Sequence, residues 1–326
     1  MKILVTGGAG YIGSFMTKCL LEKGDEVIVA DSLERGHRQA IDSRAKFYQG
    51  NLLGKEFIAK VFSENEFDGV IHFAGFISME ESTKNPYIYF HNNDFASLNI
   101  LEEMVKTKTD NFIFSSSAGV YGNPVQIPIS ENHPTHPENP YGEGKLMVEK
   151  LMAWYQKTHG LSSVALRYFN AAGAALDGSM GENHNPESHI IPNIIRAMLK
   201  GESFKLFGTD YKTKDGTCVR DYIHVLDLVD AHALAIEKLA KNKGMYVYNV
   251  GTGNEYSNRQ VLLMVEKVSG QKVNVLESER RLGDADELVA DTSKIKSELN
   301  FSPKYSDLET IVKTAWKWHS NNEKHL

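Results

Sequence analysis

Apolar residues along the chain form two kinds of pattern, short unbroken runs and longer segments with helical spacing. Helical spacing over 11–22 and 55–64, after Pro86 and after Pro140, predicts four helices. Short apolar runs predict buried strands at 3–5, 26–30, 46–49, 69–75, 111–114 and 163–169. Because these strands alternate with helices, we expect an α/β fold with a Rossmann-type, doubly wound parallel sheet.

The alternation breaks after Asn170, where residues 171–188 are rich in Gly, Ala, Asn and Asp. Beyond this break the pattern predicts helices at 189–200, 227–239 and 308–319, with strands near 204–207 and 246–250. We place the main domain boundary at the break. The expected large domain spans 1–170, with 225–250 returning to it, and a smaller mixed α/β lobe spans 171–224 and 251–326.

Length and composition fit this division. A chain of 326 residues suits one large domain plus a smaller one. Its 41% hydrophobic and 24% charged residues are typical of a soluble globular protein, and the net charge of -6 provides no basic surface for nucleic acid or an acidic membrane. The amino terminus lacks a signal-peptide pattern and no apolar run reaches membrane-spanning length, so we expect a cytoplasmic protein without nucleic-acid or membrane partners.

The two cysteines, Cys19 and Cys218, form neither a metal-binding spacing nor a disulfide framework. Two isolated thiols are typical of a protein from a reducing compartment. We therefore predict no metal site and no disulfide.

Glycines punctuate the turn after the first strand. Gly8, Gly10 and Gly13 match G-x-G-x-x-G, while Gly7, Gly10 and Gly13 match the variant with one more residue between the first two glycines. A tight turn without a ligand would look similar, but the flanking strand and helix, and a second strand ending at Asp31, are also present. Since an Asp there accepts bonds from a 2′-hydroxyl and repels a 2′-phosphate, the pattern predicts an NAD site rather than an NADP site.

The strand at 111–114 ends in three serines, Ser115, Ser116 and Ser117. Ligands bind at the carboxyl ends of strands in open α/β sheets, so a serine cluster here is placed to face a cofactor. Turn capping explains three serines about equally well on sequence alone.

Tyr141 and Lys145 lie four residues apart and share one face of the helix that begins at Pro140. A nearby ammonium and an oxidised nicotinamide both favour a phenolate, which could serve as a base. Tyr-x-x-x-Lys is a frequent accident on amphipathic helices, but here it follows a serine-ended strand and a dinucleotide pattern in chain order.

These segments together resemble the extended short-chain dehydrogenase/reductases and, among them, the UDP-glucose 4-epimerase family. The resemblance runs from residue 2 to about residue 318 and is carried by segments 5–14, 73–75, 115–118, 120–122, 140–142, 145–149, 167–173, 215–225 and 248–251. It implies an isomerase that interconverts UDP-glucose and UDP-galactose by transient oxidation at sugar C4 with bound NAD. Tyr141 would be the base, Ser117 would bond the 4-oxygen, and Lys145 would hold the nicotinamide ribose and lower the tyrosine pKa.

The resemblance also implies the residues that contact each ligand. The large domain would bind NAD through Gly7, Gly10, Tyr11, Ile12, Gly13, Asp31, Ser32, Asn51, Leu52, Phe73, Ala74, Gly75, Asn92, Ser115, Tyr141, Lys145 and Tyr168. The UDP-sugar substrate would meet Ser117, Tyr141, Phe169, Asn170, His189, Ile190, Phe207, Arg220, Arg281, Asp284 and Leu288, most of them in the smaller lobe.

Three positions depart from the family pattern. Ile77 stands where many members have a lysine that contacts the cofactor, and Asn51–Leu52 replaces the usual Asp and apolar pair near adenine. Leu288 stands where some members have a tyrosine that narrows the sugar pocket. An epimerase acting on UDP-N-acetylhexosamines therefore stays an alternative.

Two other readings are weaker. A dehydratase of the same fold needs an acidic pair beside its active-site serine or threonine, and residues 117–120 contain no carboxylate. A NAD-sensing regulatory protein would have no need of Ser117, Tyr141 and Lys145 together.

The helices after Pro86 and Pro140 are apolar on more than one face, so we also expect a homodimer in which they pair across a two-fold axis.

Overall fold

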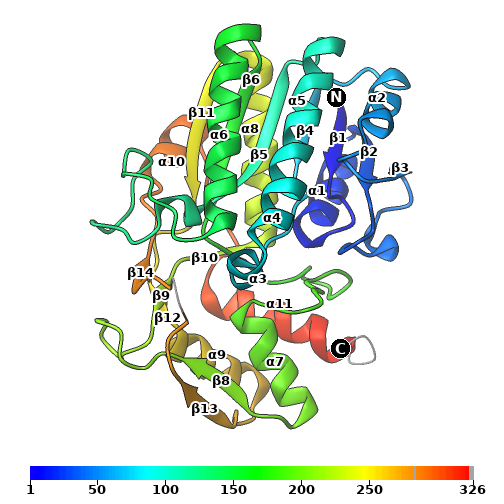
Figure 1. Cartoon of the computed structure of the whole chain (residues 1–326). Coiled ribbons are helices and arrows are strands. Elements are labelled where there is room, and N and C mark those ends of the chain that lie inside the picture. Colours follow the sequence, from blue (N-terminus) through cyan, green and yellow to red (C-terminus); the bar gives the residue numbers. More distant parts are fainter. Residues whose placement is uncertain (282–283, 323–326) are drawn as a thin grey trace.

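A seven-stranded sheet forms the larger part of the computed structural model, which describes residues 1–281 and 284–322 (Figure 1). The strand order is β11-β6-β5-β4-β1-β2-β3, and every neighbouring pair is parallel. The strands are β1 (Lys2–Thr6), β2 (Glu26–Asp31), β3 (Lys46–Gln49), β4 (Gly69–His72), β5 (Asn111–Ser117), β6 (Ser162–Tyr168) and β11 (Met245–Val250). The predicted Rossmann-type fold class is confirmed.

The sheet has its topological switch point between β1 and β4. The chain builds β1, β2 and β3 toward one edge and then returns to place β4 on the other side of β1. Ligands of such sheets bind at the carboxyl ends of the strands beside this point. The turn after β1 and the turn after β4 therefore lie together at the expected binding edge.

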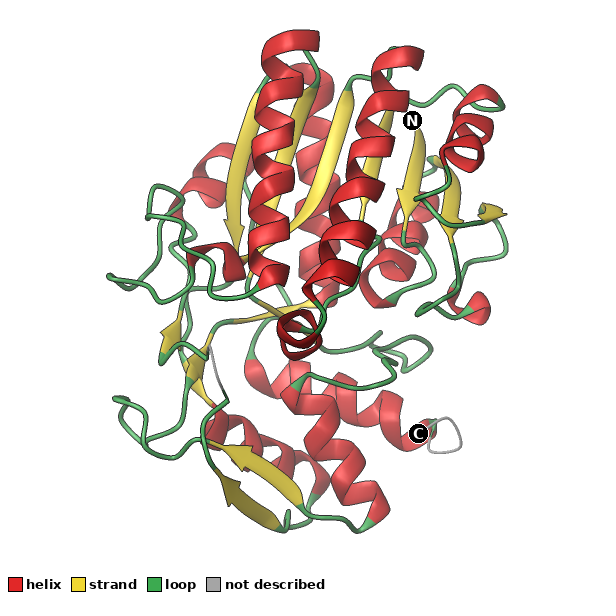
Figure 2. Ribbon diagram, in the orientation of Figure 1, coloured by secondary structure: helices red, strands yellow, loops and turns green. Residues whose placement is uncertain are grey.

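Helices cover both faces of the sheet (Figure 2). Alternate residues of β1 enter different cores, with Ile3 and Val5 in one cluster and Leu4 in the other, because successive strand residues point to opposite faces. The first cluster includes apolar residues of α1 (Tyr11–Glu22) and α8 (Val225–Lys241). The second includes those of α2 (Lys55–Ser63), α5 (Phe95–Thr107) and α6 (Pro140–His159).

The helix expected after Pro86 is not one regular helix. It consists of α4 (Pro86–Tyr89), a π-helical turn η2 (Phe90–Asp94) and α5, which follow one another without a break. Such a π turn brings an extra residue into the helix and often marks a functional site. The short helix α3 (Met79–Lys84), which the sequence pattern does not predict, lies just before this segment.

Helix α6 has clear signals at both ends. The side chain of Asn139 accepts a hydrogen bond from the backbone of Gly142 at 2.9 Å, and Pro140 occupies the first turn. Gly160 ends the helix in the left-handed conformation, with φ of 73°. These signals place Tyr141 and Lys145 in the first two turns, at the carboxyl edge of the sheet.

The smaller lobe lies at the edge to which the strand arrows point in Figure 1. Its apolar core joins α7 (Ile190–Lys200), α9 (Asn258–Ser269) and α11 (Leu308–Asn321) with the pair β8 (Phe204–Phe207) and β13 (Val275–Ser278). The other short elements are β7 (Asn170–Ala172) paired with β10 (Tyr222–His224), the sheet of β12 (Tyr256–Ser257), β9 (Val219–Arg220) and β14 (Glu287–Leu288), and α10 (Ser293–Leu299).

Helices α9 and α10 escape the sequence prediction, whereas α7 and α11 lie where it expects them. Within the described residues, no helix combines the length and apolar character that crossing a bilayer requires.

Candidate active site

A cavity of about 340 Å³ lies between the carboxyl edge of the large sheet and the smaller lobe. All the residues that the sequence analysis assigns to the cofactor line it, from Gly7 in the first turn to Tyr168 at the end of β6. The substrate candidates Ser117, Phe169, Asn170, His189, Arg220, Asp284 and Leu288 line it as well. The fold thus brings the predicted cofactor residues and most of the predicted substrate residues around one space.

The glycine turn after β1 leaves no room for side chains at two positions. A Cβ at Gly7 would lie 2.5 Å from the backbone nitrogen of Ala74, and one at Gly13 would lie 2.2 Å from the carbonyl oxygen of Gly7. Gly10 differs, since an added Cβ there would approach only the Gly7 oxygen, at 3.3 Å, and Gly10 lines the cavity. Bare backbone at the start of α1 suits the close approach of a pyrophosphate, so the residues present fit a dinucleotide.

Asp31 ends β2 and is 8% exposed. Its carboxylate accepts hydrogen bonds from the backbone nitrogens of Ala9, at 3.0 Å, and Leu33, at 2.8 Å. These bonds hold the carboxylate at the wall of the cavity, and each oxygen keeps a lone pair for a further donor. This is the arrangement that a ribose diol requires.

Ser117, Tyr141 and Lys145 meet where β5 ends beside the first turns of α6. The Lys145 Nζ donates to the carbonyl oxygen of Ser115 at 2.7 Å and lies 5.7 Å from the centre of the Tyr141 ring. The Ser115 hydroxyl is hydrogen-bonded to the Tyr168 hydroxyl. A hydroxyl, a phenol and an ammonium therefore face one part of the cavity, which suits proton transfer to or from a bound alcohol.

Burial controls the protonation of this group. It raises the pKa of the Tyr141 phenol, against the opposing effect of a hydrogen bond with Ser117, and lowers the pKa of Lys145 to about 8. Burial is the largest influence on the Tyr141 pKa within the chain, and the lowering of that pKa by Lys145 stays a prediction.

Asp94, in the π turn, is a member of this group that the sequence analysis missed. Among the described residues neither carboxylate oxygen has a hydrogen-bond partner, and burial raises the pKa of Asp94 to about 7 although Lys145 opposes the rise. The carboxylate packs against α6, where a Cβ on Gly144 would lie 2.9 Å from its Oδ1. An acidic residue in an otherwise uncharged helical turn, FHNND, was the available signal.

Arg220 occupies the opposite end of the cavity, in β9, and is 8% exposed. Its Nη1 donates to the carbonyl oxygens of Val219, at 2.8 Å, and Ala285, at 2.9 Å, and its Nη2 lies 3.7 Å from Asp284. These bonds orient a buried guanidinium toward the smaller lobe's side of the cavity. A planar cation fixed in this way suits a diphosphate.

Three substrate candidates are not among the residues that line the cavity. Arg281 is exposed and its guanidinium lies 4.2 Å from the centre of the Phe207 ring, while Ile190 begins α7. Their roles stay predictions.

Arg35 is a second residue of the site that the sequence analysis does not identify. Arg35 donates to Glu81 at 2.9 Å and reaches the carbonyl oxygen of Asn185 at 3.5 Å, and its guanidinium lies 5.0 Å from the Phe76 ring centre. It therefore connects the loop after β2 with α3 and with the segment before α7. Arg35 and its three partners all line the cavity.

Comparisons with known proteins agree with this geometry. Residues 3–251 match the NAD dependent epimerase/dehydratase family. The chain is 46% identical to the UDP-glucose 4-epimerase of Lactobacillus helveticus over 325 residues, covering 99% of this chain and 98% of that protein.

Solved structures are similar over the full length. The UDP-glucose 4-epimerase from Brucella ovis in complex with NAD has 41% identity and a TM-score of 0.93, with 97% of each chain covered. The enzyme of the same name from Bifidobacterium longum, in complex with NAD+ and UDP, has 35% identity and a TM-score of 0.95, with 100% of each chain covered.

Proposed function

The chain belongs to the NAD dependent epimerase/dehydratase family, and from that premise we propose that it interconverts UDP-glucose and UDP-galactose with NAD as its cofactor. One observation carries the proposal. A single cavity joins the glycine turn and Asp31, the group of Ser117, Tyr141 and Lys145, and the buried cation Arg220. Cofactor, reacting sugar and diphosphate can therefore be bound side by side.

NAD, when bound, would accept a hydride from sugar C4 and return it to the opposite face of the 4-keto sugar. Tyr141 removes the proton of the 4-hydroxyl during oxidation and gives it back during reduction, so the net reaction changes only the configuration at C4. The Ser117 hydroxyl donates to the 4-oxygen and stabilises the charge that develops there. Both side chains line the same stretch of the cavity, at the junction of β5 and α6.

Lys145 has a different role from Tyr141 and Ser117. Its hydrogen bond to the Ser115 carbonyl oxygen fixes the position of the ammonium, and its remaining N–H groups would donate to a ribose hydroxyl of the cofactor. A cation in this position favours the phenolate form of Tyr141 electrostatically, although burial has the larger effect in the chain alone.

The uridine diphosphate end is assigned to the smaller lobe. Arg220, Asn170 and His189 would bind the diphosphate, and Asp284 the uridine ribose. The buried guanidinium of Arg220 and the place of all four residues in the cavity wall support this assignment. Arg281 and Phe207 would contact the diphosphate and the uracil, and their stacking brings the two side chains to one spot.

An epimerase of UDP-N-acetylhexosamines is not the activity that these relatives favour. Leu288, at the wall of the cavity, is the residue that would decide whether an N-acetyl group is tolerated. Measuring turnover of UDP-N-acetylgalactosamine beside UDP-galactose separates the two substrates.

The direct test is to incubate the purified protein, supplied with NAD, with UDP-galactose and to quantify UDP-glucose by chromatography. We expect conversion toward an equilibrium mixture without net formation of NADH. Absence of UDP-glucose at high enzyme concentration would reject the proposal, and accumulation of a 4-keto-6-deoxy sugar nucleotide would identify a dehydratase instead.

We further propose a homodimer. Large apolar residues are exposed on α4, α5 and α6, including Tyr87 (74% exposed), Phe95 (56%), Met147 (40%) and Trp154 (60%). An apolar face of this kind is typical of a subunit interface. Light scattering should give twice the chain mass of 36.5 kDa, and a value of one chain mass would contradict the proposal.

The domain division is also a proposal. Residues 1–170 with 225–250 would bind NAD, and 171–224 with 251–326 would bind the UDP-sugar. The pairing of β11 with β6 supports the return of 225–250 to the large sheet.

The two free cysteines, Cys19 and Cys218, support a cytoplasmic location, since reduced thiols are typical of that compartment.

A further inference from the structure

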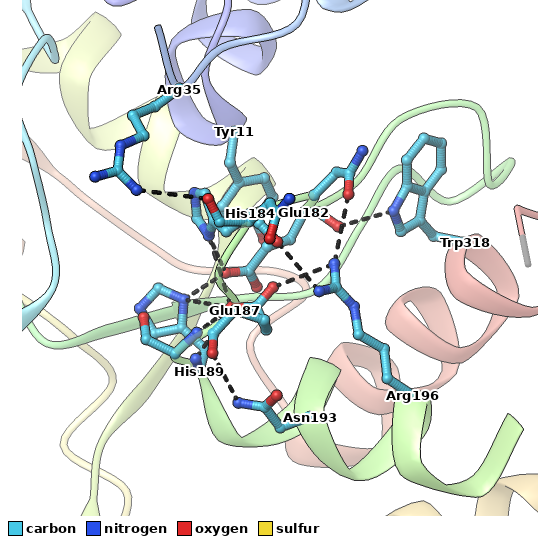
Figure 3. A network of polar contacts seen from close by, with 12 residues as sticks. Tyr11, Arg35, Glu182, His184, Glu187, His189, Asn193, Arg196 and Trp318 are labelled. Carbon is cyan, nitrogen blue, oxygen red and sulfur yellow. Dashed lines mark hydrogen bonds and ion pairs between the residues drawn. The ribbon is translucent and has the colours of Figure 1, made fainter. Parts of the chain in front are cut away.

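Four side chains of one loop converge beside the cavity, between β7 and α7 (Figure 3). They are Glu182, His184, Glu187 and His189, in the pattern E-x-H-x-x-E-x-H. Each offers one oxygen or nitrogen atom, and these four atoms all lie within 4.8 Å of one another. We propose that these side chains bind one divalent transition-metal ion of the zinc class, which ties the loop together.

The spacing of the donor atoms fits one small ion. The Nδ1 of His184 lies 2.9 Å from Glu182 Oε1 and 3.7 Å from Glu187 Oε1. The Nδ1 of His189 contacts Glu182 Oε1 and lies 3.7 Å from Glu187 Oε1. Two atoms bound to one tetrahedral zinc ion at about 2.0–2.1 Å are separated by roughly 3.3 Å, so small side-chain shifts place all four atoms around a centre.

The donor types also indicate this class of metal. Two imidazole nitrogens and two carboxylates form an N₂O₂ set, which suits zinc and its neighbours better than magnesium or calcium, because those ions prefer oxygen alone. Both histidines present Nδ1 to the same carboxylate oxygen of Glu182. One metal ion satisfies both nitrogens and that oxygen at once.

A separate observation points to a missing partner. The side chain of Glu187 is 3% exposed, and its Oε2 has no hydrogen-bond partner in the part of the chain that the structure describes. The nearest cation to that oxygen is the Arg196 guanidinium, at 3.5 Å, beyond good hydrogen-bond length. The other oxygen is held by the backbone nitrogens of Ser188, at 2.8 Å, and His189, at 3.0 Å, so the carboxylate is oriented but incompletely satisfied.

Several elements hold the loop in this shape. Trp318 of α11 donates to the carbonyl oxygen of Glu182 at 3.0 Å, and Arg196 of α7 donates to that of His184 at 3.1 Å. The Tyr11 ring lies edge-on to His184 with their centres 6.2 Å apart, and Tyr11 also belongs to the glycine turn region. Such outer contacts fix ligand orientation in metal sites.

The site joins the two parts of the molecule. His184 and His189 line the cavity, while α7 and α11 belong to the smaller lobe. A metal at Nδ1 of His189 would leave the proton on Nε2, which is then available as a donor. The sequence analysis predicted no metal because it considered only cysteine spacings, and this pattern matches neither helical nor strand periodicity.

The first experiment measures metal in tag-free wild-type protein. After incubation with Zn²⁺ and dialysis against metal-free buffer, mass spectrometry should detect about one zinc ion per chain. Dipicolinate should remove it and lower the melting temperature, and Zn²⁺ but not Mg²⁺ should restore both. Wild-type protein that binds no zinc under these conditions overturns the proposal.

The second experiment assigns the ligands. Co²⁺ added to the stripped protein should produce the visible absorption bands of four-coordinate cobalt, and His184→Gln should abolish them. His159→Gln makes the same change at an exposed histidine of α6 and should leave zinc content and cobalt bands unchanged. Retention of metal by His184→Gln, or its loss in His159→Gln, overturns the assignment. If His184→Gln does not fold, wild-type metal content decides.

The competing state is a purely ionic cluster. Although burial disfavours charged rings, hydrogen bonds to Glu182 and Glu187 raise the pKa of His184 to about 10. Nitrogen NMR of wild-type protein incubated with Zn²⁺ distinguishes the two states. Protonation of both nitrogens in both rings would overturn the metal site, whereas unprotonated, metal-bound Nδ1 atoms would support it.

Discussion

The two ends of the cavity are built in different ways. The cofactor end consists of the turn Gly7–Gly13, Asp31 and the segment Phe73–Gly75, and it is shaped by backbone from three strand ends of one sheet. The substrate end consists of Asn170, His189, Arg220, Asp284 and Leu288, which come from separate short elements and loops. Its chemistry is carried by side chains.

This difference has consequences for substitution. At the cofactor end an added atom collides with backbone that cannot move, as the 2.2 Å approach at Gly13 shows. At the substrate end a changed side chain alters charge or geometry while the scaffold remains. We therefore expect substitutions at Gly7 and Gly13 to affect folding and cofactor together, and those at the substrate end to affect substrate binding alone.

Tyr141, where the two ends meet, should show the largest effect. Tyr141→Phe removes only the hydroxyl that carries the proton, so turnover should fall about 10²–10⁴-fold while UDP still binds. Steady-state kinetics and calorimetric titration with UDP provide the two values. Tyr246→Phe is the control, since that hydroxyl bonds only the carbonyl oxygen of Lys243, at 3.4 Å. Activity of Tyr141→Phe within a few-fold of wild type would refute the assignment.

Asp94, near the cofactor end, differs from the glycines because burial destabilises its charged side chain, whereas at the glycines the constraint lies in the backbone. Its folded pKa of about 7 lies above the ordinary value, so its contribution favours folding at acid pH and is lost as pH rises from about 4 to 7. Asp94→Asn should therefore stabilise the protein by about 2–4 kcal/mol at pH 8 and by little at pH 4. Urea unfolding at both pH values measures this, and a gain independent of pH would contradict the burial argument.

Gly13→Ala and Gly10→Ala separate backbone clash from cofactor contact. The Cβ at position 13 meets the Gly7 oxygen at 2.2 Å, so that variant should lose about 1–3 kcal/mol of stability with or without NAD. Gly10→Ala, whose φ of -83° suits alanine, should fold normally and bind NAD about tenfold more weakly. Thermal melts and chromatography of released NAD provide the comparison. Equal stability of the two variants would contradict it.

Arg220→Lys tests the substrate end. Lysine keeps the charge but cannot reproduce the planar guanidinium, whose Nη1 donates to Val219 and Ala285 while its other nitrogens stay available for a diphosphate, so KM for UDP-galactose should rise about tenfold. Retention of NAD should stay unchanged. Arg259→Lys, at an exposed ion pair with Glu277, is the matched control. Loss of NAD without a change in KM would show that the two ends are not separable.

Ile77→Lys should have the smallest effect of these substitutions, and it should improve the retention of NAD. Ile77 is 39% exposed at the cavity wall, and a lysine there would add a cation beside the cofactor. We expect NAD to be lost a few-fold more slowly during dialysis at low salt, and the gain to shrink at high salt. Val125→Lys, at a residue that is 83% exposed, controls for net charge. Faster loss of NAD in Ile77→Lys would be the opposite of this expectation.

The sheet strands were predictable because buried parallel strands are short, continuous apolar runs, as in β1, β4 and β6. The π turn at Phe90–Asp94 was not, since an inserted residue leaves no signature in apolar spacing. Helix α9 was also missed, although Ser257 and Gln260 form a capping box at its start, because the reading relied on apolar periodicity. The capping box is a local sequence signal that marks the start of α9 independently of apolar spacing.

The glycine turn and Asp31 at the cofactor end could be predicted from the sequence, because glycines, a strand and an acidic residue within 31 positions act through local backbone geometry. The Tyr141–Lys145 pair could also be predicted, since helical spacing places the two on one face. Which distant side chains join them depends on the packing of the whole fold. That packing places Arg220 at the cavity and Asp94 behind its wall, and it gathers the Glu182–His189 cluster beside the cavity. The physical reason is that burial and contact across the chain depend on how the elements pack, and local patterning carries no record of that packing.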